Sequence, residues 1–151
     1  MPAYEVQVTD VAPRRLAAVR SRTSLPELGK AIRAGLDQVW PHIKDRSGLN
    51  VVVYHPSEPT GLGNEFDIET GVEVPEGFVP KPPVYLTRTP SGRAVTTAHF
   101  GSYTEMAGAY RAIEDYVRRE GLRLTGPSWE VYGHWNDDPA KVRTDIFFPV
   151  G

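Results

Sequence analysis

The chain has 151 residues, which is enough for one compact domain with a hydrophobic core and too few for two ordinary domains. Its formal net charge of -2 gives no basic surface for nucleic acid, and the absence of cysteine excludes disulfides and thiolate metal sites. No apolar run approaches the roughly 18 residues of a membrane span, and the start of the chain does not resemble a signal peptide. We therefore expect a cytoplasmic protein without direct contact to membrane or nucleic acid.

The first half of the chain predicts two strands, a helix and two more strands. Strands are expected over about 3–9 and about 15–22, with the turn residues APRR between them. The segment SLPELGKAIRAGLDQVW repeats apolar residues every three or four positions and predicts an amphipathic helix, which Pro41 should kink or end. Ser24 and Glu27 form the pattern of a capping box at its start. The last two strands are predicted in NVVVYHP and EFDIETGVEV.

The second half repeats this order after the proline-rich joint PEGFVPKPP. Strands are expected over about 84–89 and about 93–100, followed by a helix in SYTEMAGAYRAIEDYVRRE and strands in SWEVYGHW and RTDIFFPV. Sliding the sequence by 78 positions brings Ser24 onto Ser102 and keeps identical residues in register without a gap. Among these are Val53 with Val131, Tyr54 with Tyr132 and Asp67 with Asp145. We therefore predict one domain over residues 1–151 with an internal repeat, 1–78 and 79–151.

Helices that are apolar on one face must cover a sheet, and strands joined in hairpins pair in antiparallel fashion. The sequence therefore predicts an α+β fold of two pseudo-symmetric ββαββ-type halves. In this fold a curved antiparallel sheet of eight strands carries both helices on its outer face. The inner face is then expected to form a central cleft along the joint of the two halves.

Glu130 breaks the repeat, because its counterpart is Val52, whereas Tyr132 is matched by Tyr54. Strand alternation places Glu130 and Tyr132 on one face, so we expect the carboxylate and both tyrosines to line the cleft. A buried carboxylate either takes up a proton or finds a donor. Glu130 therefore suits the neutralisation of a flat cation between aromatic walls, or general acid–base chemistry. The structural alternative is a solvated glutamate, or one paired with Arg143 on the neighbouring strand.

Three further residues are candidates for the walls of the cleft. His99 precedes the turn into the second helix and would line the mouth of the cleft, with a packed or solvated histidine as the alternative. Phe66 and Phe147 lie on the last strand of each half and suit either the cleft or the core. The four histidines lack the helical spacing of metal ligands, so we expect no metal and no cofactor.

The segments HFGSYTEMAGAY, GPSWEVYGHWNDDPAKVRTDIFFPV and FDIETGVEV resemble the GyrI-like small-molecule-binding superfamily. This superfamily includes the effector domains of AraC-type and MerR-type multidrug regulators and the gyrase-inhibitory proteins. The resemblance covers essentially the whole chain and implies a duplicated β-α-β-β core with a central cleft. It also implies that Glu130 lies at the base of an aromatic pocket for lipophilic, often cationic compounds, walled by residues such as Tyr54 and Tyr132. The sequence shows no helix-turn-helix pattern before the domain, so we expect it to resemble the stand-alone members.

Three functions are open at this point. The favoured one is the sequestration or sensing of hydrophobic, aromatic small molecules, cations included, in a cleft formed by Glu130, Tyr54, Tyr132, Phe66, His99 and Phe147. Some stand-alone relatives hydrolyse cyclopropanoid compounds, which implies a hydrolase of strained electrophiles with Glu130 as general base and Tyr132 or Tyr54 as proton donor. The third is a protein–protein modulator of the gyrase-inhibitor kind, although no charge run suggests the necessary patch. The sequence leaves open whether the protein is a monomer or a homodimer.

Overall fold

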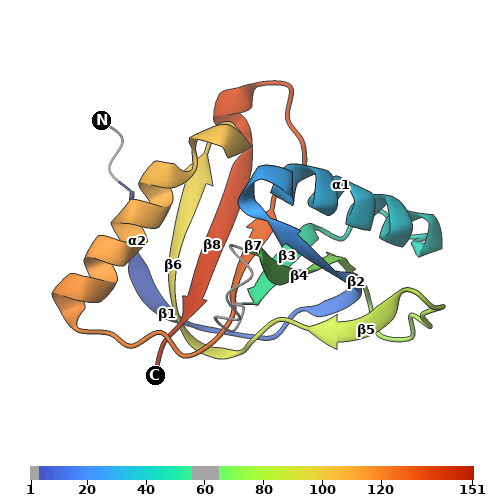
Figure 1. Ribbon diagram of the computed structural model, residues 1–151, viewed down its shortest axis with the longest axis horizontal. Coiled ribbons are helices and arrows are strands. Elements are labelled where there is room, and N and C mark those ends of the chain that lie inside the picture. The colour runs from blue at the N-terminus through green and yellow to red at the C-terminus, as the bar shows by residue number, and fades with distance from the viewer. Residues whose placement is uncertain (1–3, 56–64) are drawn as a thin grey trace. The chain divides into compact units, whose positions relative to one another are not determined.

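The computed structural model describes residues 4–55 and 65–151, and these form two compact units (Figure 1). The terminal unit holds both ends of the chain, Met1–Ala12 and Pro90–Gly151, and the central unit is Pro13–Thr89. Within the described residues there are eight strands and two α-helices, and the strands of each unit pair in antiparallel fashion. The predicted α+β class is therefore confirmed. None of the helices described is long and apolar enough to cross a membrane.

The central unit is a four-stranded sheet with one helix on it. Its strands run in the order β3-β4-β2-β5 and comprise β2 (Arg15–Ser24), β3 (Asn50–His55), β4 (Glu65–Glu73) and β5 (Tyr85–Arg88). Helix α1 (Leu28–Val39) covers one face of this sheet. The core between them consists of Ala17, Val19, Val39, Ile43, Val72, Val74 and Val84.

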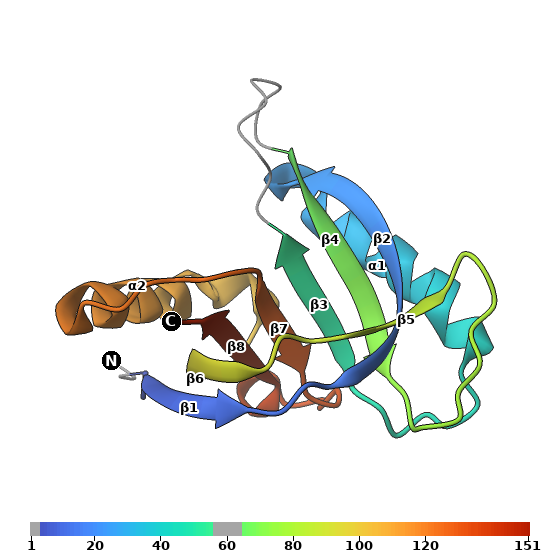
Figure 2. The same ribbon diagram turned by 90° about the horizontal axis from the view of Figure 1, so that it is seen from below.

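The terminal unit has the same arrangement, as both views show (Figure 2). Its strands run in the order β1-β6-β8-β7 and comprise β1 (Gln7–Val11), β6 (Gly92–Phe100), β7 (Ser128–Tyr132) and β8 (Arg143–Pro149). Helix α2 (Ala107–Glu120) lies along one face. The core beneath it consists of Val95, Met106, Ala109, Ile113, Ile146 and Val150.

The first strand of each half does not pair with the strand that follows it. Strand β1 pairs with β6, and β5 pairs with β2, so the expected β1–β2 and β5–β6 hairpins are wrong. APRR lacks the positive-φ residues of a tight hairpin turn, which accounts for the first missing hairpin; TPSGR contains one in Gly92, so turn composition does not account for the second. The repeat in the sequence stays a prediction, and its boundaries differ from those of the two units.

Both helices begin with a short 3-10 turn, so their α-helical parts start later than the sequence pattern indicates. Ser102 accepts a hydrogen bond from the backbone N–H of Thr104 at 3.2 Å, whereas the Ser24 side chain makes no such bond. Helix α1 ends at Val39, two residues before Pro41, as expected from the missing proline N–H. Residues 3 and 56, at the ends of two predicted strands, lie outside the described residues.

Candidate functional site

Glu130 lies on the face of the terminal-unit sheet that α2 covers. It is opposite Ile146 in the β7–β8 ladder, and Ile146 belongs to the core beneath α2. The side chain of Glu130 is 4% exposed, so its carboxylate is buried. The sequence instead predicts this carboxylate on the face that the helices leave bare. Strand alternation groups residues by face but does not indicate which face the helix covers.

Two tyrosines donate hydrogen bonds to the two oxygens of this carboxylate. The Tyr110 hydroxyl, from α2, donates to Oε2 of Glu130, and the Tyr132 hydroxyl donates to Oε1 at 2.5 Å. Hydrogen bonds to an ionised acceptor are short and stronger than neutral ones. They also supply the partners that a buried carboxylate requires.

A third tyrosine completes a cage of aromatic rings. Tyr103 meets Tyr132 edge to face, with ring centroids 5.5 Å apart, and Tyr110 meets Phe148 in the same way at 5.9 Å. Tyr103 is 46% exposed and is therefore the outermost of the three rings. We refer to Tyr103, Tyr110 and Tyr132 around Glu130 as the tyrosine cage.

Thr144 lies beside the cage and has an unsatisfied hydroxyl. It is opposite Tyr132 in the β7–β8 ladder, so both side chains face α2. The residue is fully buried, and its Oγ1 has no hydrogen-bond partner among the described residues. Because a buried hydroxyl without a partner is costly, Thr144 offers a group that a bound polar molecule would satisfy.

His99 lies on the same face but is used as an anchor. Its Nε2 is 2.9 Å from the backbone oxygen of Ser102, and its Nδ1 is 2.8 Å from the Tyr4 hydroxyl. A carbonyl oxygen can only accept, so Nε2 carries a hydrogen, and in the neutral imidazole Nδ1 then accepts from the Tyr4 hydroxyl. With both nitrogens bonded and 3% exposure, His99 fixes the β6–α2 turn, which matches the packed alternative.

The remaining predicted residues are distributed over both units. Tyr54 and Phe66 belong to the central unit and pack on each other, with ring centroids 6.3 Å apart. Their participation in a site with Glu130 stays a prediction. Phe147 stacks on Trp129 at 5.0 Å and faces away from Glu130, because β7 and β8 pair these two residues on the other face. The structure therefore does not bring Phe147 together with the carboxylate.

Sequence reasoning missed a second buried carboxylate, in the central unit. Glu69 is 8% exposed and accepts hydrogen bonds from the Tyr85 hydroxyl and from Nε2 of His55, both at 2.6 Å. Burial, together with the bond to Glu69, raises the pKa of Tyr85 above its ordinary value. The alternation of Glu65, Asp67 and Glu69 along the strand is typical of a solvated face, which concealed this residue. Within residues 4–55 and 65–151, no group of three histidine or acidic side chains could hold a metal ion.

The terminal unit is thus an antiparallel sheet covered by a helix, with a carboxylate buried under tyrosines, in an α+β domain. The sequence also matches the GyrI-like small molecule binding domain over residues 4–151. The chain therefore belongs to this family, and the resemblance seen in its motifs is confirmed.

Solved structures share the fold. The EcmrR C-terminal domain is 23% identical with a TM-score of 0.73, and the match covers 98% of each chain. A hydrolase encoded by lin2189 from Listeria innocua is 14% identical (TM-score 0.61, covering 97% of this chain and 92% of that one). SAV2435 bound to tetraphenylphosphonium is 13% identical (TM-score 0.63, covering 97% and 94%). At these identities the likeness shows the fold alone. No curated protein matches the sequence.

Proposed function

We propose that the chain sequesters or senses lipophilic, aromatic small molecules, cations included, and that Glu130 is the centre of the binding site. The observation that carries this proposal is the buried carboxylate of Glu130, which the hydroxyls of Tyr110 and Tyr132 hold from two elements. A cation placed in the tyrosine cage would be attracted by this carboxylate and by the faces of the surrounding aromatic rings.

The energy balance favours a cation with delocalised charge. At an effective dielectric constant of about 20, a unit charge about 4 Å from a carboxylate gains roughly 4 kcal/mol. Displacing one phenol from Glu130 costs about 1.5–3 kcal/mol, and each cation–π contact returns about 0.5–2 kcal/mol. Small, strongly hydrated ions lose this advantage through desolvation, whereas lipophilic cations have little hydration to lose.

The path to Glu130 leads through the cage. Tyr103 is the exposed outer ring, Tyr132 packs against it, and the carboxylate lies behind Tyr132. A ligand that enters past Tyr103 would therefore turn Tyr132 aside to reach Glu130. In support of such a ligand, SAV2435, which shares the fold, binds tetraphenylphosphonium.

The test compares tetraphenylphosphonium with the neutral triphenylphosphine oxide by isothermal titration calorimetry. We expect Glu130→Gln to weaken binding of the cation about tenfold or more and to change binding of the neutral compound little, because it keeps the shape of the side chain and removes its charge. Glu69→Gln is the matched control, since it removes a buried carboxylate from the other unit. Equal affinity of wild type and Glu130→Gln for the cation would contradict the proposal.

The second candidate function is ring-opening hydrolysis of strained electrophiles such as cyclopropanes conjugated to a carbonyl group. It is favoured by the carboxylate–phenol pair of Glu130 and Tyr132, whose oxygens are 2.5 Å apart. In this reaction Glu130 takes a proton from water while the water oxygen bonds to a ring carbon. The carbon–carbon bond breaks, its electron pair moves to the carbonyl oxygen, and that oxygen takes the Tyr132 proton. The proton on Glu130 then returns to Tyr132, so the net change is the addition of one water.

Turnover distinguishes this candidate from binding alone. A cyclopropane-bearing quinone-type substrate is incubated with wild type, Glu130→Gln and Tyr132→Phe, and the hydrated product is measured by mass spectrometry. The hydrolase candidate requires product formation by wild type and its loss in Glu130→Gln, with substrate binding retained. Product formed at equal rates by wild type and Glu130→Gln would exclude Glu130 as the base.

A further inference from the structure

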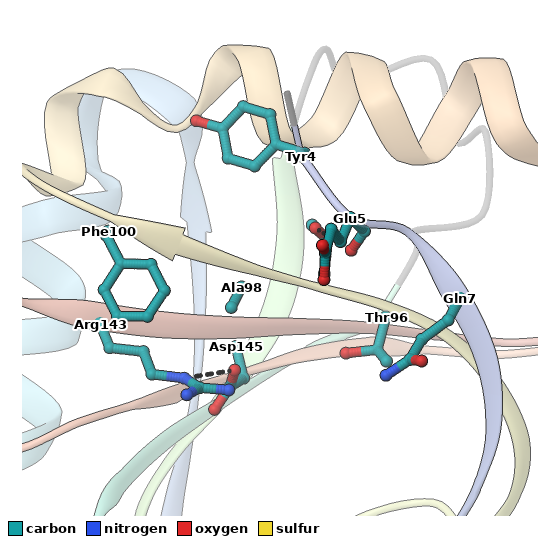
Figure 3. Close-up of a pocket in the computed structure, with 9 residues that line it drawn as sticks. Tyr4, Glu5, Gln7, Thr96, Ala98, Phe100, Arg143 and Asp145 are labelled. Atoms are coloured by element: carbon teal, nitrogen blue, oxygen red, sulfur yellow. Dashed lines mark hydrogen bonds and ion pairs between the residues drawn. The ribbon is translucent and has the colours of Figure 1, made fainter. Parts of the chain in front are cut away.

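A pocket of about 400 Å³ lies on the other face of the terminal-unit sheet, away from Glu130 (Figure 3). Its floor is formed by outward-facing residues of β6 and β8, and the segment before β1 forms one wall. The β6 residues that alternate with this floor, Thr97 and His99, are opposite Ile146 and Thr144 on the α2 face. The lining reaches that face only at the edge of the sheet, through Thr97 and through Tyr4, which bonds His99. The pocket is therefore separate from the tyrosine cage. The residues named as its lining are Tyr4, Glu5, Gln7, Thr96, Thr97, Ala98, Phe100, Arg143 and Asp145.

The apolar part of the floor is formed by Ala98 and Phe100, which neighbour each other on this face of β6. Ala98 leaves the space open, and Phe100 next to it on this face is 56% exposed. The Arg143 guanidinium lies over the Phe100 ring, 5.4 Å from its centroid, so one face of this ring already contacts a planar cation of the chain itself. The wall is fixed to the sheet because the Thr97 hydroxyl donates to the backbone oxygen of Glu5 at 2.8 Å.

The rim of the pocket is acidic. Arg143 forms an ion pair with Asp145, at 3.0 Å between Nε and Oδ1, and the two charges cancel. The remaining charge is the carboxylate of Glu5, which forms no ion pair within the described part of the chain. Gln7 and Thr96 add an amide and a hydroxyl oxygen that accept hydrogen bonds. The lining thus presents acceptors and one net negative charge beside an apolar floor.

We propose that this pocket is a second small-molecule site and that it takes aromatic monocations with an amidinium or ammonium group. The aromatic ring of the ligand covers Ala98 and contacts Phe100, and its cationic group binds the Glu5 carboxylate and the oxygens of Gln7 and Thr96. The volume lies within the range of ligand pockets. Anionic compounds are disfavoured because Glu5 would repel them.

The affinity of this site should be weak. An exposed ion pair and an exposed cation–π contact each strengthen binding only about two- to fivefold. A fragment that gains mainly from these contacts and a small apolar floor should bind with a Kd on the order of 1 mM. The appropriate measurement is therefore a two-dimensional NMR titration of the 15N-labelled full chain, which detects binding in this range.

The probes are benzamidinium, benzyl alcohol and benzoate, which share a ring and differ in charge. We expect benzamidinium to shift the amide signals of β6 and β8 and benzyl alcohol to bind about threefold more weakly than benzamidinium. Benzoate should cause no shift. Ala98→Leu fills the floor of the pocket and should abolish binding. Glu5→Gln should weaken benzamidinium about two- to fivefold while leaving benzyl alcohol unchanged.

Glu130→Gln tests whether this pocket is independent of the proposed site at Glu130. Because Glu130 lies on the opposite face of the sheet, the substitution should leave the benzamidinium shifts at β6 and β8 unchanged. Benzamidinium shifts that persist in Ala98→Leu, or that vanish in Glu130→Gln, would overturn the proposal, as would the absence of any shift in wild type. If Ala98→Leu does not fold, Phe100→Leu replaces it, with a loss of at least twofold in benzamidinium affinity expected from the missing ring.

Discussion

Tyr110→Phe is the sharpest test of the tyrosine cage, because it removes one hydroxyl and leaves the packing of the ring. The phenol donates to Oε2 of Glu130 from α2, so it joins the helix to a buried carboxylate on β7. The ring itself packs edge to face against Phe148, a contact that phenylalanine keeps. The part of the stability loss that depends on Glu130 therefore reports on this hydrogen bond.

The expected cost follows from the charge of the acceptor. A hydrogen bond to a charged group contributes about 1.5–3 kcal/mol, against about 0.5–1.5 kcal/mol for a neutral pair. For a chain of this size each kcal/mol corresponds to about 2–4 °C in Tm, so Tyr110→Phe should lower Tm by about 3–12 °C. In a Glu130→Gln background the same substitution should cost about 1 kcal/mol less, because the acceptor is then neutral.

The assay is urea unfolding of the four proteins of this double-mutant cycle, with Tyr116→Phe as the matched control. Tyr116 is also a partly buried tyrosine of α2, and its hydroxyl makes no hydrogen bond within the described residues. We expect Tyr116→Phe to cost less than about 0.5 kcal/mol. A cost of Tyr110→Phe no larger than that of Tyr116→Phe, or an equal cost with glutamate and glutamine at position 130, would refute the reasoning.

Two further predictions concern the central unit. A Cβ at Gly35 would lie 2.8 Å from Cβ of Thr70, so Gly35→Ala should lower the free energy of unfolding in urea by about 1–3 kcal/mol. Gly29→Ala in the same helix should not lower it, because nothing lies within 4 Å of a Cβ there. Equal effects of the two substitutions would contradict the close approach of helix and sheet at Gly35. Burial and the bond to Glu69 raise the pKa of Tyr85, so above about pH 10 this phenol stays protonated in the folded chain while it ionises in the unfolded chain. The free energy of unfolding is therefore unaffected by ionisation of Tyr85 below about pH 10 and falls as the pH rises further. Tyr85→Phe should flatten this fall in urea midpoints measured between about pH 8 and pH 11, and an unchanged slope would contradict it.

Elements with a clear hydrophobic period could be predicted from the sequence almost to the residue. Strand β8 was expected over RTDIFFPV and runs over Arg143–Pro149, and the proline rule correctly ended α1 at Val39. Strand pairing could not be predicted in the same way, because the partner of β1 is β6, more than 80 residues further along the chain. Local patterns carry no information on such a partner.

The site was predictable in its centre and not in its surroundings. Glu130 was recognisable because a carboxylate between β-branched and aromatic residues has a cost that Val52, at the matching position, does not have. Tyr110 was not, because a tyrosine on the apolar stripe of a helix looks the same whether its hydroxyl is buried against a carboxylate or points to water. His99 shows the converse, since its position suggested a cleft, whereas both its nitrogens bind neighbouring turns and side chains.

Tyr110 also offers a direct test of the proposed function, because its hydroxyl donates to Oε2 of Glu130, the carboxylate that a bound cation would contact. If a lipophilic cation takes the place of Tyr110 at Glu130, Tyr110→Phe should bind tetraphenylphosphonium at least as tightly as wild type despite its lower stability, since no hydrogen bond then has to be broken. Calorimetric titration decides this, because a role of Tyr110 in binding the cation would instead weaken the affinity together with the stability.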